Sequence, residues 1–182
     1  MGSFFTRDGD DGYTGLLGEG RIAKSDVRIE LLGTLDEANA ALGLARAWAT
    51  ADQNKAMLLQ AQRDLYLIMT EVAATPENVT RFARIGAEHV ARLESSIETI
   101  SQNISIPKEF IVPGDTPAEA GLDLARTVVR RAERRVMELA QAGQLQNTII
   151  LGYLNRLSSL CFILELVENQ RAGQIKPTLA KG

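Results

Sequence analysis

The chain has 182 residues, of which 45% are hydrophobic and 24% are charged, a composition typical of one soluble globular domain. Its net charge of −3 gives no general electrostatic support for binding nucleic acid. One cysteine, Cys161, excludes an intrachain disulfide and favours a reducing, cytoplasmic compartment. We expect no membrane-spanning helix, because no apolar run is long enough, and no secretory signal at the N-terminus.

Residues 1–24 are rich in glycine and in charged residues, and they show neither a helical nor a strand period. Such a composition is typical of a flexible tail. Against that interpretation, the aromatic residues Phe4, Phe5 and Tyr13 are interspersed among the polar ones. We therefore expect an irregular arm with a function of its own.

Two nucleotide-binding motifs are nearly present in this arm. The run Gly18–Ala23 resembles the dinucleotide fingerprint, but no strand precedes it, which excludes a Rossmann unit. Gly15 and Gly20 have the spacing of a P-loop, but Arg21 stands where lysine is required. Glycines still let backbone N–H groups approach a phosphate closely, and nearby cations strengthen such a site.

From Ser25 onwards the apolar residues recur with a helical period. The first predicted helix begins near residue 25, and four more cover about 52–74, 84–103, 116–143 and 145–169. The connector 104–115 contains Phe110–Val112, which we expect to pack inward. The sequence therefore predicts an all-α fold without a sheet, a five-helix up-and-down bundle with an irregular glycine-rich N-terminal arm. We divide this single domain into arm (1–24), bundle (25–170) and C-terminal tail (171–182).

The helix predicted over 116–143 has the clearest boundaries. Thr116, Pro117 and Glu119 form a T-P-x-E start, and Gly143 stands where a helix usually ends. One flank of its apolar stripe carries several charged side chains, whereas Arg131 and Arg135 point away from the stripe; the flanking residues are Asp123, Arg126, Arg130, Glu133 and Arg134. Two interpretations stay open, a salt-bridged surface and an anion-binding site.

Other chemistries find little support in the sequence. A di-iron bundle requires repeated Glu-x-x-His pairs, but His89 is the only histidine. Structural zinc requires clusters of cysteine and histidine. A Ser-His-Asp triad would have to use His89, and no serine lies in a nucleophile motif. What remains is a glycine-rich arm that could wrap a triphosphate, with arginines from a helix and with Glu133 near Mg²⁺.

The ordered set of motifs resembles the trimeric helix-bundle ATP:cob(I)alamin adenosyltransferases of the PduO type. The motifs are TRDGDDGYTGLLGEGRIAKSD, GTLDEANAALGLARA, QRDLYLIMTEVA, FIVPGDTP, LARTVVRRAERRV and YLNRLSSLCFIL, which together cover most of residues 5–170. The resemblance implies a homotrimer with active sites between subunits. It also implies transfer of the 5′-deoxyadenosyl group of ATP to Co(I) of a corrinoid, with release of triphosphate. A reductase and an adenosylcobalamin-dependent enzyme are the implied partners.

The resemblance also implies a set of site residues. Arg130, Glu133 and Arg134 would be catalytic, and Glu133 would hold Mg²⁺, directly or through water. The residues implied to bind ATP are Thr6, Arg7, Asp8, Gly9, Thr14, Gly15, Lys24, Arg130, Arg131, Glu133, Arg134 and Asn155. For the corrinoid wall our candidate is Phe110, and for a subunit interface we expect Asp36 to pair with an arginine such as Arg130.

Several positions depart from the family's pattern, and they concern the corrinoid side and the interface. Asp123 stands where histidine is usual, Asp115 replaces a glycine, Ser159 replaces an aspartate, and Leu166 replaces an arginine. An alternative function therefore stays open, a trimeric bundle without catalysis that carries or senses ATP and the corrinoid.

Overall fold

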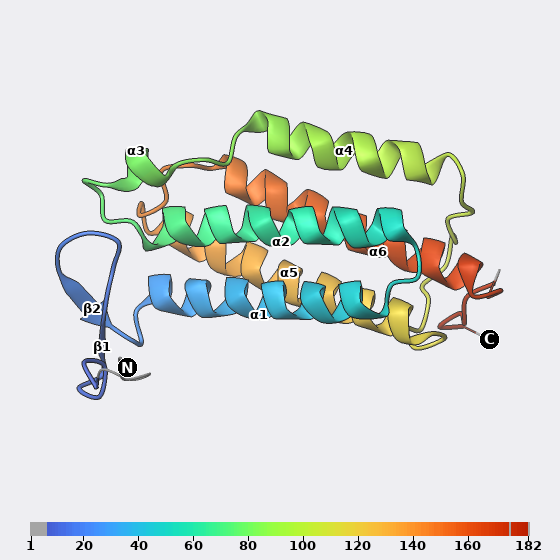
Figure 1. Cartoon of the computed structure of the whole chain (residues 1–182), viewed down its shortest axis with the longest axis horizontal. Coiled ribbons are helices and arrows are strands. Elements are labelled where there is room, and N and C mark those ends of the chain that lie inside the picture. Colours follow the sequence, from blue (N-terminus) through green and yellow to red (C-terminus); the bar gives the residue numbers. More distant parts are fainter. Residues whose placement is uncertain (1–6, 175, 182) are drawn as a thin grey trace.

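The computed structural model describes residues 7–174 and 176–181, and it is a bundle of long helices (Figure 1). The long helices run alternately up and down, as the sequence predicts. They are α1 (Val27–Trp48), α2 (Asp52–Ala73), α4 (Ala87–Ser101), α5 (Pro117–Gln141) and α6 (Ile149–Arg171), with a single-turn helix α3 (Val79–Phe82) between α2 and α4. Two short strands, β1 (Tyr13–Gly15) and β2 (Arg21–Ala23), precede them.

The caps read from the sequence define the start of α5. The Thr116 hydroxyl accepts a hydrogen bond from the Glu119 backbone N–H at 3.2 Å, and Pro117 takes the first helical position. The Glu119 carboxylate accepts from the backbone N–H groups of Gly114 (2.6 Å) and Asp115 (3.0 Å), so it also fixes the end of the connector. Beyond the helix, Gly143 adopts a positive φ of 69°, which suits glycine at this place.

Two predicted helix boundaries were wrong by a few residues. The last helix begins at Ile149 and not near Leu145, because the Asn147 side chain accepts from the Ile149 backbone N–H at 3.1 Å and ends the preceding loop. The helix predicted from Arg84 begins at Ala87, after Gly86 in an extended conformation.

The apolar stripes of the helices meet in one continuous core. Those of α5 and α6 are fully buried; they comprise Leu122, Ala125, Val129, Ala132, Val136 and Leu139 with Ile150, Leu154, Leu157, Cys161 and Leu164. Contrary to the sequence expectation, α6 is long and apolar enough to span a membrane, but most of that stretch is buried inside the bundle. Burial raises the pKa of the Cys161 thiol to about 12, so this cysteine is a core residue and not a thiolate nucleophile.

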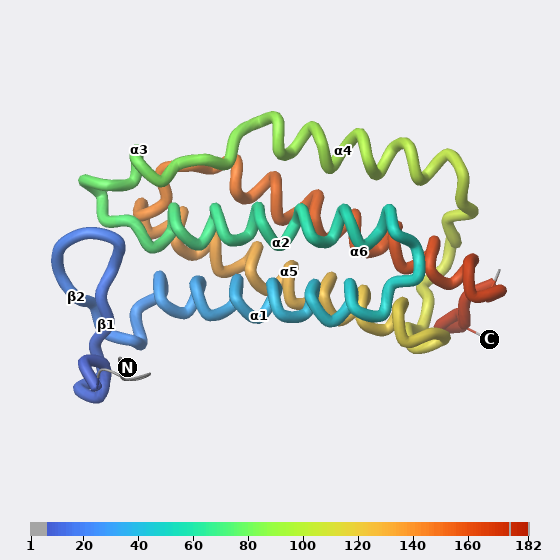
Figure 2. The backbone as a smooth tube through the Cα atoms, in the orientation of Figure 1, coloured from blue at the N-terminus to red at the C-terminus, as the bar shows by residue number. Residues whose placement is uncertain are grey.

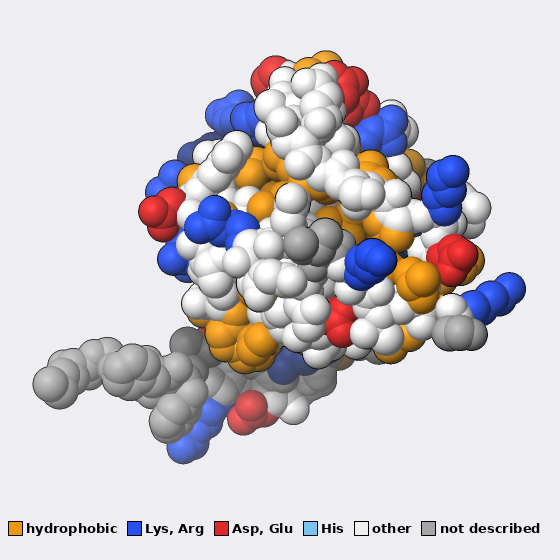
Figure 3. Space-filling view, turned by 90° about the vertical axis from the view of Figure 1, so that its right-hand side faces the viewer, with side chains coloured by type: hydrophobic (Ala, Val, Ile, Leu, Met, Phe, Trp, Pro, Cys, Tyr) orange, Lys and Arg blue, Asp and Glu red, His pale blue; other side chains and the backbone are white. Residues whose placement is uncertain are grey.

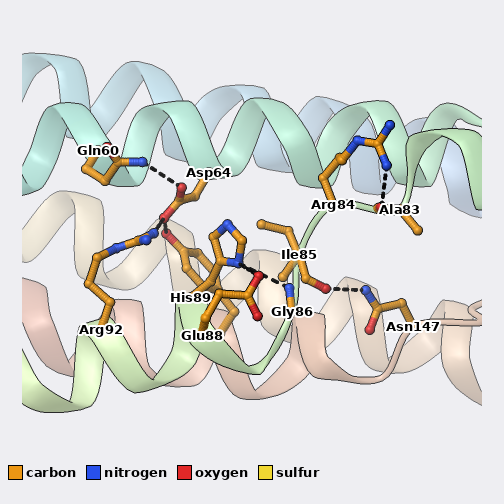
Figure 4. A network of polar contacts seen from close by, with 11 residues as sticks. Gln60, Asp64, Ala83, Arg84, Ile85, Gly86, Glu88, His89, Arg92 and Asn147 are labelled. Carbon is orange, nitrogen blue, oxygen red and sulfur yellow. Dashed lines mark hydrogen bonds and ion pairs between the residues drawn. The ribbon is translucent and has the colours of Figure 1, made fainter.

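A buried polar network joins α4 to the other helices (Figure 4). Asp64 of α2 is only 1% exposed, and it accepts hydrogen bonds from the Tyr153 hydroxyl (2.8 Å) and the Arg92 guanidinium (2.6 Å). Nearby, His89 Nδ1 accepts from the Gly86 backbone N–H at 3.1 Å, at the start of α4. The only histidine of the chain therefore has a structural partner at a helix end.

The arm contains a small hairpin, which the sequence did not predict. Strands β1 and β2 pair antiparallel, with Thr14 opposite Ile22. The Arg21 guanidinium binds both Asp11 carboxylate oxygens at 2.8 Å and also donates to the Tyr13 carbonyl oxygen at 3.0 Å. Three-residue strands are too short to show an alternating pattern in the sequence, which is why this hairpin was not predicted. Its stability comes from the side-chain contacts of Arg21.

Leu17 docks the arm on the C-terminal end of α2. Its N–H donates to the Ala73 carbonyl at 2.8 Å, and its carbonyl accepts from the Thr75 N–H at 3.3 Å. Gly18 follows with a φ of 154°, and a Cβ there would lie 2.2 Å from the Thr75 hydroxyl oxygen. Glycine is therefore required at this close approach.

Figure 3 shows the opposite end of the molecule, where hydrophobic side chains are visible beneath the lobe at the top. At this end the C-terminal tail pairs with the connector between α4 and α5. The Val112 N–H donates to the Thr178 carbonyl, and the Ala180 N–H donates to the Phe110 carbonyl, both at 2.8 Å. Thr178 also donates to the Asp115 carboxylate through its N–H (2.8 Å) and its hydroxyl (2.7 Å).

Candidate active site

A polar cluster joins the middle of α5 to α6. Asn155 donates through Nδ2 to Glu133 Oε1 at 2.9 Å, and its Oδ1 accepts from the Arg156 guanidinium at 2.7 Å. Arg156 in turn donates to Glu94 of α4 at 2.8 Å. Glu133 and Asn155 were both expected in the site, and the structure brings them together. Arg156 and Glu94 were not expected, because their contact joins helices that are far apart in the sequence.

The arginines of α5 divide into paired and unpaired groups. Arg126 binds Asp123, Arg131 binds Glu37 of α1, and Arg135 binds both Glu30 and Glu138. For Arg126 and Arg135 these pairs fit the interpretation as a salt-bridged surface, whereas Arg131, which the resemblance assigns to ATP, has an ion-pair partner in this chain. The partner of Arg131, which the helical period directs outward, lies on a neighbouring helix.

Arg130 and Arg134 are different, since both are exposed and neither pairs with a carboxylate in the part of the chain that is described. The Arg134 guanidinium donates only to the Arg130 carbonyl oxygen at 3.0 Å. The two residues lie one turn apart on the stretch of α5 that also carries Glu133. Arginine forks match phosphate oxygens, so this is the part of α5 best suited to an anion.

The arm gathers a second set of candidates. The Lys24 ammonium lies so close to Gly9 that a Cβ at this glycine would be 2.8 Å from Nζ, and Lys24 donates through its N–H to the Gly12 carbonyl. Thr14 lies in β1 and faces Ile22, while Gly15 faces Arg21. Arg7 has a φ of 67°, unusual for a residue with a side chain. Asp8 precedes Gly9, and Thr6 lies outside the described residues.

Within one chain, the arm and the α5 cluster occupy different places. The arm stands beyond the N-terminal end of α1, whereas residues 130–134 lie in the middle of α5 (Figure 1). The backbone tube in Figure 2 shows the same separation between the arm and α5. Of the predicted ATP-binding residues, the chain therefore brings together Glu133 and Asn155 between α5 and α6, and separately Gly9 and Lys24 in the arm.

Phe110 is 89% exposed, so the expectation that this part of the connector packs inward was wrong. Its backbone is held by the tail, which leaves the ring at the surface. Beside it is a cavity of about 370 Å³ between the connector, α5 and α6. The lining includes Phe110, Ile111, Pro113, Asp123, Arg126, Phe162 and Glu165.

Glu165 is a buried acid that the sequence analysis did not single out. It is 1% exposed, and its Oε2 atom has no hydrogen-bond partner in the described part of the chain. Burial, and then the charges of Asp123 and Glu119, raise the pKa of Glu165 to about 8. The signal was present in the sequence, because Glu165 follows Cys161 by four residues and so continues an apolar stripe.

Two further candidates are positioned as follows. Asp36 is an exposed residue of α1, and no ion pair of its side chain is found in the described residues. For a metal, no group of three or more acidic, histidine or cysteine side chains forms among the described residues. Glu133 is the carboxylate nearest along α5 to Arg130 and Arg134, which have no carboxylate partner in the described chain.

Comparisons with known proteins show what this chain is similar to. The sequence model of the cobalamin adenosyltransferase family matches residues 4–168. The corrinoid adenosyltransferase PduO of Salmonella typhimurium is 38% identical over 174 residues, 94% of this chain and 51% of that protein. The corrinoid adenosyltransferase of Mycobacterium tuberculosis is 39% identical over 171 residues, 91% of this chain and 88% of that protein. The chain thus spans about half the length of its PduO relatives from Salmonella typhimurium and Citrobacter freundii.

A solved structure matches over nearly the whole chain. A variant of the PduO-type ATP:corrinoid adenosyltransferase from Lactobacillus reuteri, complexed with cobalamin and ATP, superposes with a TM-score of 0.89 at 28% identity. The match covers 99% of this chain and 100% of the other.

Proposed function

Because the chain belongs to the cobalamin adenosyltransferase family, we propose that it transfers the 5′-deoxyadenosyl group of ATP to cob(I)alamin and releases triphosphate. The named activity of its relatives supports this proposal. The observation that carries it is the α5–α6 cluster, in which Glu133 binds Asn155 while Arg130 and Arg134, on the same stretch of α5, have no carboxylate partner among the described residues.

In this reaction the reduced cobalt is the nucleophile. A cobalt–carbon bond forms at C5′ while the C5′–O bond breaks, and the triphosphate leaves with the electron pair. The protein therefore has to bind the leaving group, to align C5′ with cobalt and to exclude water. No side chain has to attack, which agrees with the absence of a nucleophile motif in the sequence.

We assign the triphosphate to Arg130 and Arg134, with Arg131, Glu133 and Asn155 completing that side of the site. The guanidinium forks of Arg130, Arg131 and Arg134, all three exposed, suit a ligand of high negative charge. The arm residues Thr6, Arg7, Asp8, Gly9, Thr14, Gly15 and Lys24 would wrap the nucleotide from the other side. The approach of the Lys24 ammonium to Gly9 supports this assignment. It places a positive charge next to a backbone that has no side chain to keep a phosphate away.

We further propose that the arm of one subunit covers the α5–α6 cluster of its neighbour in a homotrimer. The separation of the two sets within one chain supports this arrangement. So do Asp36 and Arg130, which are exposed on the neighbouring helices α1 and α5 without a pairing carboxylate or arginine in the described chain. Exposed apolar side chains of the same two helices, among them Trp48 (46%) and Leu124 (48%), fit a subunit contact.

Magnesium fits this site only as a companion of the phosphates. With no three-ligand group in the described residues, the ion would take most of its oxygen ligands from triphosphate and water, and Glu133 would hold it directly or through one of those waters. When bound, the ion neutralises charge on the leaving group. The corrinoid would lie against Phe110, because the exposed ring is apolar and has no atom that could coordinate cobalt.

The decisive experiment mixes the full chain with ATP, Mg²⁺ and chemically reduced cobalamin without oxygen. We expect the absorbance spectrum of adenosylcobalamin to appear, with one triphosphate released per corrinoid. ATP binding without cobalt–carbon product would instead support the alternative, a bundle that carries or senses the cofactor. In a cell the reaction needs a reductase to supply Co(I) and an adenosylcobalamin-dependent enzyme to use the product, and we propose the cytoplasm as its compartment.

A further inference from the structure

The cavity beside Phe110 has one feature that its apolar lining does not explain. Most of the connector and Phe162 present apolar surface, but Glu165 of α6 reaches the same lining. This carboxyl is 1% exposed, and its Oε2 atom lacks a hydrogen-bond partner in the part of the chain described. Buried polar atoms normally find a partner, so an orphan oxygen at a cavity wall indicates a ligand.

The charges that face Glu165 come from three elements. From α5 come Asp123, Glu119 and Arg126; the connector contributes Lys108 and Glu109 at the cavity lining, and Cys161 precedes Glu165 on α6. Arg126 does not neutralise Glu165, because Asp123 Oδ1 already binds its Nε at 2.8 Å and its Nη2 at 2.6 Å. Glu119 is occupied with the backbone N–H groups of Gly114 and Asp115.

The protonation state of Glu165 follows from these neighbours. Since its pKa is raised to about 8, the side chain is mostly a neutral acid at pH 7. A neutral carboxylic acid has an O–H group to donate, unlike the carboxylate form. The wall of this cavity therefore offers a hydrogen-bond donor that has no acceptor of its own among the described residues.

We propose that Glu165, as a neutral carboxylic acid, donates a hydrogen bond to an amide carbonyl oxygen on the rim of the corrinoid and thereby helps to hold this substrate. The inference rests on the proposed function. A corrinoid carries uncharged amides around an apolar ring, which matches an uncharged donor among apolar side chains. The Asp123 position, where the family's pattern has histidine, is part of the same arrangement, because its charge adds to the burial of Glu165 in raising the pKa of that carboxyl.

Ionised Glu165 would fit the same substrate poorly. It could accept a hydrogen bond from an amide N–H. The bound corrinoid would then bury two carboxylates, Asp123 and Glu165, with only the Arg126 guanidinium to balance their charges, which is unfavourable. If only the neutral form binds well, the apparent dissociation constant rises as the neutral fraction falls. For a pKa of about 8, binding at pH 9 should be about tenfold weaker than at pH 7.

The test is the binding of cob(II)alamin to the full chain with ATP and Mg²⁺, followed anaerobically by absorbance from pH 7 to pH 9. Cob(II)alamin is chosen because none of its groups titrates in this range. We expect the wild-type affinity to fall about tenfold, and that of Glu165→Gln to stay within about twofold, because the amide donates at every pH. Glu109→Gln, at the same cavity but exposed, should keep the wild-type pH profile.

Two results would overturn the inference. One is a wild-type affinity that does not change with pH, which requires no variant at all. The other is a Glu165→Gln protein that binds ATP normally yet shows the wild-type pH profile for cob(II)alamin. Failure of the proposed function has a different signature, since no cobalt–carbon product would then form from reduced cobalamin and ATP at any pH.

Discussion

The α5–α6 cluster around Glu133 and the cavity beside Phe110 are built from the same two helices, but their charges balance in opposite ways. In the cluster, Arg130 and Arg134 have no carboxylate partner in the described chain. In the cavity, Arg126 is bound by Asp123, and the buried Glu165 is left over. The first surplus is positive and suits a polyanion, and the second is a neutral acid that suits an uncharged polar ligand. The same two helices can thus carry two neighbouring sites, one suited to a polyanion and the other to an uncharged ligand.

The largest expected effect breaks the first half of this comparison. Arg134→Ala removes a guanidinium proposed to bind the leaving group, so we expect kcat/KM for ATP to fall by about 10²-fold or more. Arg135→Ala is the matched control, because the neighbouring Arg135 only binds Glu30 and Glu138 at the surface, and it should stay within about twofold. Steady-state kinetics with both substrates measures this; equal effects of the two variants would refute the division of the arginines.

A second variant tests whether the cluster is completed by another subunit. Asp36→Ala would leave Arg130 of the neighbour without its proposed partner, so we expect turnover to fall by about tenfold and the trimer to weaken. Gel filtration with light scattering gives the assembly state. Trimers and turnover that both match the wild type would remove Asp36 from the interface.

A mixing experiment tests the same point without relying on one pair. The arm variant Lys24→Ala and the helix variant Arg134→Ala should each be poorly active alone. In trimers reassembled from equal amounts of both, a site between subunits receives an intact arm and an intact helix in about one case in four. We therefore expect recovery to about a quarter of the wild-type rate. No recovery in demonstrably mixed trimers would place both residues in the same subunit's site.

The smallest effect sharpens the second half of the comparison and concerns stability. The folded-state pKa of Glu165 is raised from 4.5 to about 8, so the folded protein binds a proton that the unfolded chain has released. This contribution is fully present below pH 4.5 and is lost as pH rises to about 8. Glu165→Gln should therefore lose less stability than the wild type between pH 5 and pH 8, by on the order of 1–3 kcal/mol. Urea unfolding at both pH values measures the difference, and parallel losses would contradict it.

Much of the fold and part of the site could be predicted from the sequence. The apolar period and the caps at Thr116 and Gly143 located the helices, because local sequence determines both. The same period separated Arg134 from Arg135. The helices of the bundle were thus accessible from spacing alone, and the family motifs added the arm.

The remaining features depend on contacts between distant residues. The hairpin of the arm rests on Arg21 and Asp11, ten residues apart, and no strand pattern signals it. Phe110 was expected inside because it is apolar, but the tail fixes its backbone and leaves the ring outside. Glu165 and Glu168 illustrate the limit well. They lie on the same helix and are both buried, yet four hydrogen bonds from Thr50, Ala51 and Asn54 satisfy Glu168 and help lower its pKa, whereas that of Glu165 is raised.

The contacts of Arg21 have a consequence for the kinetics of nucleotide capture. The guanidinium ties Asp11 to the Tyr13 carbonyl, and it holds the Asp11 carboxyl at a lowered pKa, so the turn keeps its shape in mildly acidic solution. A loop that is ordered in advance loses little conformational entropy when its ligand arrives. Association should then be governed by diffusion and charge, and the residence time of ATP by how firmly the neighbouring helix closes on it.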